Sequence, residues 1–318
     1  MKRRSILKLL GAALPATGAF AQSASTRPIR IIVPLSSGTP SDAMTRIIAP
    51  SLSAILGQPV VVENKPGANG IIATQELMRA APDGTTLMMS SASALAINMA
   101  LVKNLPYDSR RDFTPVAGAY SANHVWMVKP NFPAKNMAEF VAHLKKNPGK
   151  VSVGSSSALQ QLQLAAFDKM AGTDMLVVPY KSTAGSFTDF LGGTLDLSLT
   201  DMGGAASWVR GGQARVLGVT TLKRNTLQPD WPAISETVPG FDFSSWTALV
   251  GPAGMAPDVV NRLNTAMSQV LKQKDIIDKF REGSTVPLAM TPGEFQAFLN
   301  AEVAKSIRVA REANIQPE

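Results

Sequence analysis

The sequence contains no cysteine, and this absence excludes several kinds of stabilisation and chemistry. A chain of 318 residues without cysteine has no disulfide bond, no thiol nucleophile and no thiolate metal site, so its stability must come from a packed core. Histidine is also scarce, because only His124 and His143 are present. The sequence has no H-E-x-x-H, G-x-S-x-G or G-x-x-x-x-G-K motif, so we expect neither a bound metal nor a cofactor.

Basic residues outnumber acidic ones only slightly. The formal net charge is +8, and residues 1–21 contribute +4 of it through Lys2, Arg3, Arg4 and Lys8. The remaining +4 is spread without a basic cluster, so we expect no nucleic-acid partner. Long apolar runs are also missing after residue 21, which excludes a predicted membrane-spanning helix there.

Residues 1–21 have the features of a secretory signal peptide. A basic start is followed by the apolar stretch 6–14 and then by Ala19-Phe20-Ala21, which resembles a signal-peptidase site. We therefore predict export to the periplasm with cleavage after Ala21. The pair Arg3-Arg4 is also typical of twin-arginine signals, so the twin-arginine and the general secretory routes both remain open.

The rest of the chain alternates short β-branched segments with amphipathic helical segments. This alternation predicts an α/β fold with a largely parallel sheet. The predicted strands are residues 29–34, 59–64, 85–89, 124–130, 150–154, 175–180, 195–199, 214–220 and 245–252. Capping-box patterns predict helix starts at Asn136 and Thr291, and Pro257 opens the first of two predicted C-terminal helices.

Several predicted strands end in loops rich in serine and threonine. Ligands of open α/β sheets bind outside the carboxyl ends of the strands, so these loops form a candidate binding site. The alternative is that the hydroxyl groups only cap the following helices. The candidate ligand-binding residues in and beside these loops are Ser36, Ser37, Gly38, Thr39, Ser41, Asp42, Ser91, Ser155, Ser156, Ser157, Tyr180, Lys181 and Asp201.

The first of these loops precedes a predicted helix, whose free N–H groups and dipole favour an anion. Ser41 is the predicted N-cap of this helix, with Asp42 in its first turn. We expect an anionic ligand to be held by backbone N–H groups near Gly38–Ser41 and by hydroxyl groups such as that of Ser155. A plain strand–helix connection with capping residues is the alternative.

A series of short motifs carries a resemblance to a known family. They include Gly57–Ala68 (G-Q-P-V-V-V-E-N-K-P-G-A), Pro82–Leu87 (P-D-G-T-T-L), Leu105–Asp108 (L-P-Y-D), Val178–Lys181 (V-P-Y-K) and Ser245-Trp246. In this order the motifs resemble the periplasmic substrate-binding proteins of tripartite tricarboxylate transporters, the Bordetella uptake gene or Bug family.

The resemblance implies a two-lobed fold of the type II periplasmic binding proteins. Each lobe would be a largely parallel sheet flanked by helices, and two crossing strands, 124–130 and 245–252, would act as a hinge. Residues 22–122 with 250–318 would form the first lobe, and residues 123–249 the second. A small organic acid or amino acid would bind in the cleft, membrane subunits of a transporter would be the partner, and the chain would be a monomer.

The sequence departs from the family pattern in two loops. Gly38 is followed by Thr39 instead of a second glycine. The loop 155–157 is a run of serines where the family has a glycine-rich loop, and Gln161 stands in the place of the family's histidine. The identity of the ligand therefore stays open.

Three further alternatives remain at this point. The chain could be a periplasmic sensor that docks on a membrane protein instead of feeding a transporter. It could also be a periplasmic enzyme that uses Asp42 and Asp201 as an acid–base pair, although we expect no enzyme. Trp126 and Trp246 could pack in the core or could line the cleft.

Overall fold

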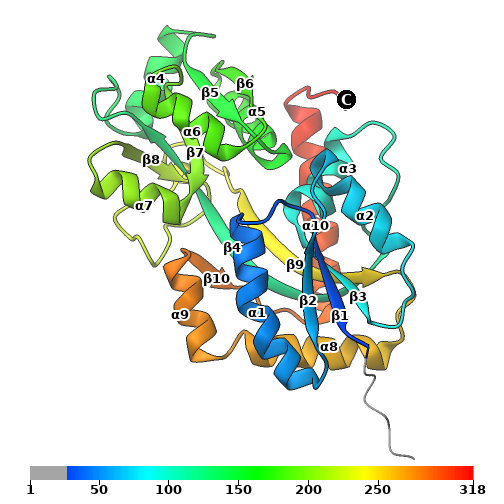
Figure 1. Ribbon diagram of the computed structural model, residues 1–318. Coiled ribbons are helices and arrows are strands. Elements are labelled where there is room, and N and C mark those ends of the chain that lie inside the picture. Colours follow the sequence, from blue (N-terminus) through cyan, green and yellow to red (C-terminus); the bar gives the residue numbers. More distant parts are fainter. Residues whose placement is uncertain (1–26, 318) are drawn as a thin grey trace, which may run out of the picture.

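The computed structural model describes residues 27–317, so the predicted signal peptide lies outside the described residues. A ten-stranded mixed sheet runs through the molecule in the order β2-β1-β3-β9-β4-β7-β5-β6, and β8 and β10 also pair with β4 (Figure 1). The strands are β1 (Ile29–Val33), β2 (Val60–Asn64), β3 (Thr86–Ser91), β4 (Phe113–Val128), β5 (Ser152–Ser155), β6 (Leu176–Pro179), β7 (Leu197–Asp201), β8 (Arg215–Val219), β9 (Ser244–Pro252) and β10 (Thr285–Pro287).

Helices cover both faces of this sheet. The helices are α1 (Pro40–Leu56), η1 (Ala68–Gly70), α2 (Ile71–Met78), η2 (Ser93–Ile97), α3 (Asn98–Leu101), α4 (Met137–Lys146), α5 (Ala158–Ala171), α6 (Thr183–Gly192), α7 (Met202–Arg210), η3 (Ile234–Glu236), α8 (Pro257–Val270), α9 (Lys274–Glu282) and α10 (Pro292–Glu312). None of the helices within residues 27–317 combines the length and the apolar character that crossing a bilayer requires.

Strand β4 joins the two halves of the sheet. Its residues 113–123 pair with β9, whereas residues 124–128 pair with β7 and residues 125–128 with β8. The chain returns to the first half between Phe243 and Ser244. The N–H of Phe243 still donates to the carbonyl of Thr220 in the second half, whereas Ser244 already pairs with Asn123. We call β1, β2, β3, β9, β10 and residues 113–123 the first half, and β5 to β8 with residues 124–128 the second half.

The prediction for β4 was wrong over its first eleven residues, because it began the strand at His124 instead of Phe113. Residues 113–123 contain Pro115 and several alanine, glycine and serine residues, which have a weak strand propensity. Pairing with β9 on one side and β10 on the other makes this segment a strand. Tertiary contacts therefore override local propensity here.

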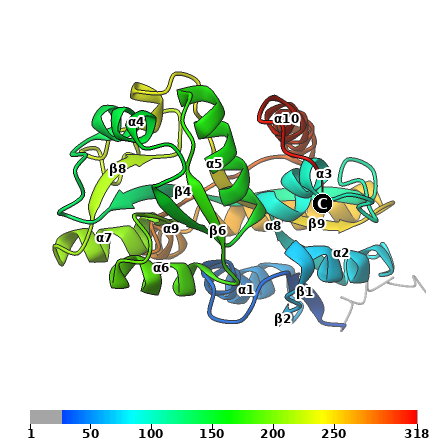
Figure 2. The ribbon, with the colours of Figure 1, turned by 90° about the horizontal axis from the view of Figure 1, so that it is seen from above.

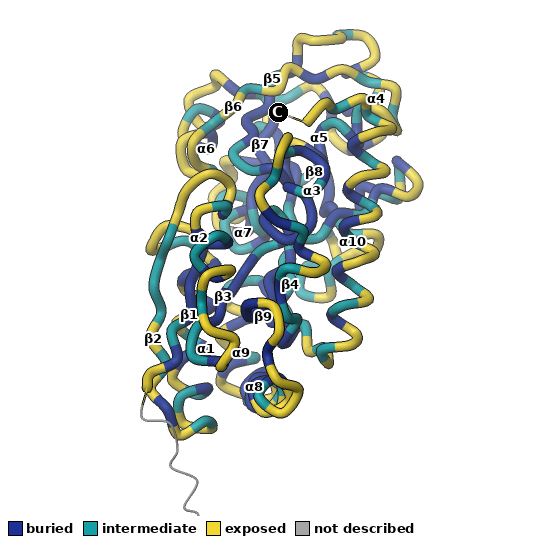
Figure 3. The backbone as a smooth tube through the Cα atoms, turned by 90° about the vertical axis from the view of Figure 1, so that its right-hand side faces the viewer, coloured by how far each residue is buried: buried dark blue, intermediate teal, exposed yellow. Residues whose placement is uncertain are grey.

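Side chains of β4 alternate between two cores, as the period of a strand requires. Val125 and Met127 pack with α6 and α7, whereas Trp126 and Val128 pack with α4 and α5. The core that contains Trp126 continues into the first half through η2 and α10. Figure 2 shows α5 and α10 side by side, and Figure 3 shows the buried strands enclosed by exposed helix surfaces.

The tryptophan alternatives are resolved in favour of core packing. Both Trp126 and Trp246 are 0% exposed. The ring of Trp126 lies 4.7 Å from that of Phe167, and the indole N–H of Trp246 donates to Glu302 at 3.0 Å. The core-packing interpretation is therefore confirmed, and the alternative of a role in lining the cleft is wrong.

Two helix predictions also need correction. The N-cap of α1 is Thr39 and not Ser41, because Pro40 is already helical and the Thr39 hydroxyl accepts a hydrogen bond from the N–H of Asp42. The C-terminal part contains α9 in addition to the two predicted helices; only Ile276 and Phe280 of this short, charged helix are buried. By contrast, the helix starts at Asn136 and Thr291 are confirmed.

Candidate functional site

The predicted loops all lie at the carboxyl ends of parallel strands. In the first half β1 runs parallel to β2 and β3, and in the second half β5 runs parallel to β6 and β7. In Figures 1 and 2 the amino end of α1 lies on the side of the first half that faces the second half. The candidate residues are thus shared between two strand edges, one in each half.

The loop between β1 and α1 is organised around Asp42. Its carboxylate accepts the N–H of Gly38 at 2.9 Å and the hydroxyl of Ser37 at 3.4 Å, and it pairs with Arg46 at 2.8 Å. Burial by itself raises the pKa of Asp42, but Gly38, Asn64 and Arg46 together hold this pKa below its ordinary value. The carboxylate of Asp42 is therefore ionised and already occupies the N–H group of Gly38.

This arrangement reduces the number of backbone N–H groups near Gly38–Ser41 that are free for a ligand. The N–H of Gly38 is taken by Asp42, and the N–H groups of Asp42 and Ala43 are taken by Thr39. The hydroxyl of Thr39 also donates to the carbonyl of Ser36, so this loop is held closed by its own contacts. Arg46 balances the charge of Asp42, so this ion pair offers an outside anion no unpaired positive charge.

The loop between β5 and α5 makes a similar turn without any charge. Gln160, which is 3% exposed, accepts the N–H of Ser156 at 2.7 Å and its hydroxyl at 3.0 Å. Ser157 is the N-cap of α5. The hydroxyl of Ser155 has only a 3.5 Å contact with the carbonyl of Ser157, so it remains available for another partner.

The loop between β6 and α6 lies beside the serine loop. The hydroxyl of Thr183 lies 2.9 Å from that of Ser156, which joins the two loops. Tyr180 donates its phenol to Asp189, and this hydrogen bond raises the pKa of Tyr180. Lys181 is exposed and forms no ion pair within residues 27–317.

Asp201 ends β7 and is the N-cap of α7. One carboxylate oxygen, Oδ1, accepts the N–H of Gly204 at 2.9 Å. Asp201 pairs in register with His124 of β4, so the two side chains lie on the same face of the sheet. The His124 ring contacts Gln163 of α5, whose Oε1 lies 3.2 Å from His124 Nδ1.

Ser41 and Ser91 lie near two residues that the sequence analysis missed. Ser91 belongs to the end of β3 and not to the following loop; it pairs with Thr247, which in turn pairs with Tyr120. The buried hydroxyl of Tyr120 lies near the hydroxyls of Ser41 and Thr247 without a well-formed hydrogen bond to either, and burial raises the pKa of Tyr120 more than these neighbours lower it. No sequence motif marks Tyr120 or Thr247, because strand register brings them together.

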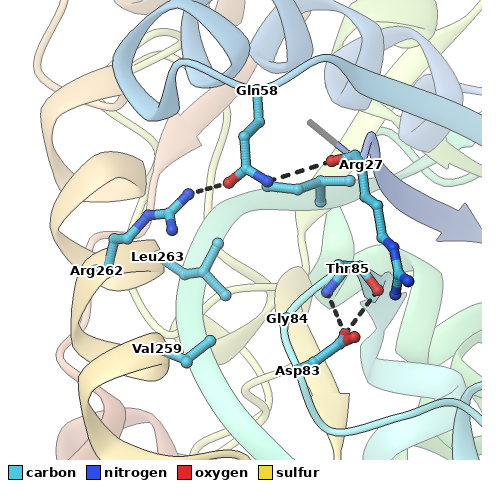
Figure 4. A pocket seen from close by; sticks show the side chains of 9 residues that line it. Arg27, Gln58, Asp83, Gly84, Thr85, Val259, Arg262 and Leu263 are labelled. Atoms are coloured by element: carbon cyan, nitrogen blue, oxygen red, sulfur yellow. Dashed lines mark hydrogen bonds between the residues drawn. The ribbon is translucent and has the colours of Figure 1, made fainter. Parts of the chain in front are cut away.

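A separate pocket of about 290 Å³ lies at the opposite, amino edge of the first half. Figure 4 shows that the side chain of Gln58 bridges Arg262 and the carbonyl of Arg27, while Thr85 donates to Asp83. These polar groups satisfy one another. The pocket contains none of the residues that the sequence analysis selected.

Comparison with known proteins identifies the relatives of this chain. The model of the tripartite tricarboxylate transporter family receptor matches residues 44–315. The chain is 31% identical to protein BugT of Bordetella pertussis over 320 residues, which cover 98% of each chain.

Solved structures with bound acids are similar as well. R. palustris Rpa4515 with adipate is 29% identical, with a TM-score of 0.84 over 92% of this chain and 99% of that chain. MatC from Rhodopseudomonas palustris with bound malate is 25% identical, with a TM-score of 0.79 over 90% and 99%. The fold class and the family that the sequence predicts are thereby confirmed. This chain belongs to the tripartite tricarboxylate transporter receptor family, whose members are periplasmic solute-binding proteins.

Proposed function

We propose that the chain binds a small carboxylate-bearing ligand between the two halves of the sheet and delivers it to the membrane subunits of a tripartite tricarboxylate-type transporter. Family membership is the observation that carries this proposal. The relatives Rpa4515 and MatC hold adipate and malate, which are both small carboxylates. The uncharged hydroxyl and amide groups around Ser155, Ser156 and Thr183 are suited to an acid of this kind.

The same proposal covers export and closure. Residues 1–21 act as the cleaved signal, and the mature chain is a monomer. Residues 27–123 with 244–317 form one lobe and residues 124–243 form the other, so that the chain crosses at 123/124 and 243/244, whereas the sequence suggested boundaries at 122/123 and 249/250. Ligand favours the closed arrangement because only that state contacts it from both sides.

An acid–base role for Asp42 and Asp201 is not supported by their contacts. Asp42 is bound by Gly38 and Arg46, and Asp201 caps α7. Asp42 is held by several contacts within its own loop and helix, and Asp201 uses one of its two oxygens to cap its helix. We therefore propose a binding role and no reaction.

Thermal-shift and calorimetric measurements on the mature chain test ligand capture. We expect at least one of succinate, malate, glutarate, adipate, aspartate or glutamate to raise the melting temperature and to bind with measurable heat. Small-angle scattering should then show a smaller radius of gyration with that acid. If none of these acids binds, the carboxylate function is wrong.

Uptake measurements test delivery. A strain that lacks the gene should lose uptake of the radiolabelled acid, and the gene in trans should restore it. Unchanged uptake alongside tight binding in vitro would instead indicate a sensor. Mass spectrometry of the periplasmic fraction should find the mature chain beginning at Gln22.

A further inference from the structure

Asp201 carries a charge that nothing in the described residues neutralises. Its Oδ1 accepts the N–H of Gly204, while its Oδ2 has no hydrogen-bond partner and the carboxylate has no ion pair within residues 27–317. Asp201 is only partly exposed and lies at the strand edge where the proposed ligand binds. An unneutralised carboxylate at this place repels a second carboxylate and attracts a hydrogen-bond donor.

His124 adds a second acceptor beside Asp201. The two residues are directly paired in the antiparallel ladder of β4 and β7, so their side chains are neighbours on the face covered by α5. Gln163 is 0% exposed, and its Oε1, which can only accept a hydrogen bond, faces Nδ1, so we assign the proton of a neutral His124 ring to Nδ1. Nε2 is then a free acceptor.

The charge state of the ring follows from its surroundings. Burial lowers the pKa of His124, while Gln163 and Asp201 act in the opposite direction and do not cancel it. The ring is therefore neutral near pH 7, so it does not neutralise Asp201.

A carboxylate-binding group lies next to this acceptor pair. The strand β5 is the neighbour of β7 and leads into the serine loop, and Gln160 of α5 donates to the carbonyl of Leu199 in β7. The hydroxyl of Ser155 and the amino end of α5 favour an anion, whereas Asp201 and His124 require a donor. One strand edge thus offers two opposite kinds of recognition.

We propose that Asp201 and His124 form an acceptor pair that selects acids carrying a hydroxyl or ammonium group beside a carboxylate over the unsubstituted acids. This inference rests on the proposed carboxylate-binding function and specifies its ligand class. Gln163 is a positioning residue, because it orients the His124 ring without facing the ligand.

Calorimetry with matched acids tests the selection. The probes are succinate, glutarate and adipate, each with its 2-hydroxy and 2-amino derivative, so that only one substituent differs within a series. We expect a derivative to bind at least about ten-fold more tightly than its parent, which corresponds to one close charge or hydrogen-bond contact. Comparing the affinities of the 2-hydroxy and 2-amino derivatives shows which hydrogen-bond donor is preferred.

Asp201→Asn is the deciding variant. Asparagine caps a helix about as well as aspartate, so α7 and the melting temperature should be preserved. In this variant the preference for the substituted acid should fall to about three-fold or less. The parent acid should bind the variant more tightly than it binds the wild-type protein. Asp42→Asn is the matched control, and it should leave the preference unchanged because that carboxylate already pairs with Arg46.

The protonation of the ring gives a second measurement. The chain has two histidines, so nitrogen-15 spectra contain two ring systems, which His143→Gln assigns. We expect the proton of neutral His124 on Nδ1 and a shift of its Nε2 resonance when a substituted acid binds.

Several results would overturn the inference. They are equal binding of parent and derivative, an unchanged preference in Asp201→Asn, or a proton on Nε2 of His124. Each of these leaves the carboxylate function intact. A wild-type chain that binds no acid of any series would overturn the proposed function and the inference together.

Discussion

Asp42 and Asp201 both lie at the start of a helix that follows a strand, Asp42 in the first turn of α1 and Asp201 as the N-cap of α7, yet they have different electrostatic surroundings. Both lie where a strand of the sheet meets a helix, and each accepts a nearby backbone N–H, from Gly38 and Gly204 respectively. Arg46 stands four residues after Asp42 and neutralises it, whereas the residue four positions after Asp201 is Ala205. The same side chain thus closes a loop in the first half and leaves a free charge in the second.

The comparison extends to the loops themselves. In the first half a charged carboxylate accepts the loop N–H, and in the second half the neutral Gln160 does so for Ser156. Both acceptors lie four residues after the donor. The first-half loop is therefore stabilised by its own charge, and the second-half loop keeps neutral groups available for an anion.

Removing each carboxylate in turn should give the largest difference in stability between the two halves. Asp42→Ala should lower the free energy of unfolding by about 2–3 kcal/mol, because charge-assisted contacts with Gly38 and Arg46 are lost. Asp201→Ala should cost only about 1 kcal/mol, the usual effect of losing an N-cap. Urea unfolding of both variants near pH 7 measures the difference, and equal losses would contradict it.

The contribution of Asp42 should depend on pH. The pKa of Asp42 is below its ordinary value of 3.8 in the folded chain, so the unfolded chain binds the proton more readily. The stabilisation is complete above the unfolded pKa and is lost as the pH falls through the folded pKa. The stability gap between wild type and Asp42→Ala should therefore close below about pH 4; a gap that closes above about pH 5 would argue against this account.

Ser155→Ala tests whether a hydroxyl of the second half serves the ligand and not the fold. The hydroxyl of Ser155 has only a long contact within the protein, so its loss should affect the ligand more than the fold. We expect affinity for the bound acid to fall about ten-fold and the melting temperature to stay nearly constant. Calorimetry measures the affinity, and thermal unfolding measures the melting temperature. The matched variant in the first half is Ser37→Ala, which removes a hydroxyl that contacts Asp42.

Lys181→Ala should have the smallest effect. The side chain is exposed and salt screens its charge, so we expect affinity to change by less than about two-fold. The measurement is calorimetry at low and moderate salt. A loss of nearly all affinity would mean that a charge pair anchors the acid and that the neutral loops do not.

The sequence was most informative where local chemistry decides the structure. The strand–loop–helix units, the caps at Asn136 and Thr291 and the serine loop at 155–157 depend on neighbouring residues, and they were predicted. It failed at residues 113–123, because weak strand formers become a strand only between two partners. It also placed the cap of α1 at Ser41 instead of Thr39.

By itself the sequence determined the family, the alternation of strands and helices, and the position of hydroxyl groups at the ends of strands. The tertiary structure alone decided which of these groups are free. Strand register places His124 beside Asp201, although 77 positions separate them in the chain, and packing of α5 brings Gln163 to the His124 ring. The contact of Gly38 with Asp42 occupies one of the expected backbone donors. Such pairings depend on where whole strands and helices pack, which local sequence preferences do not specify.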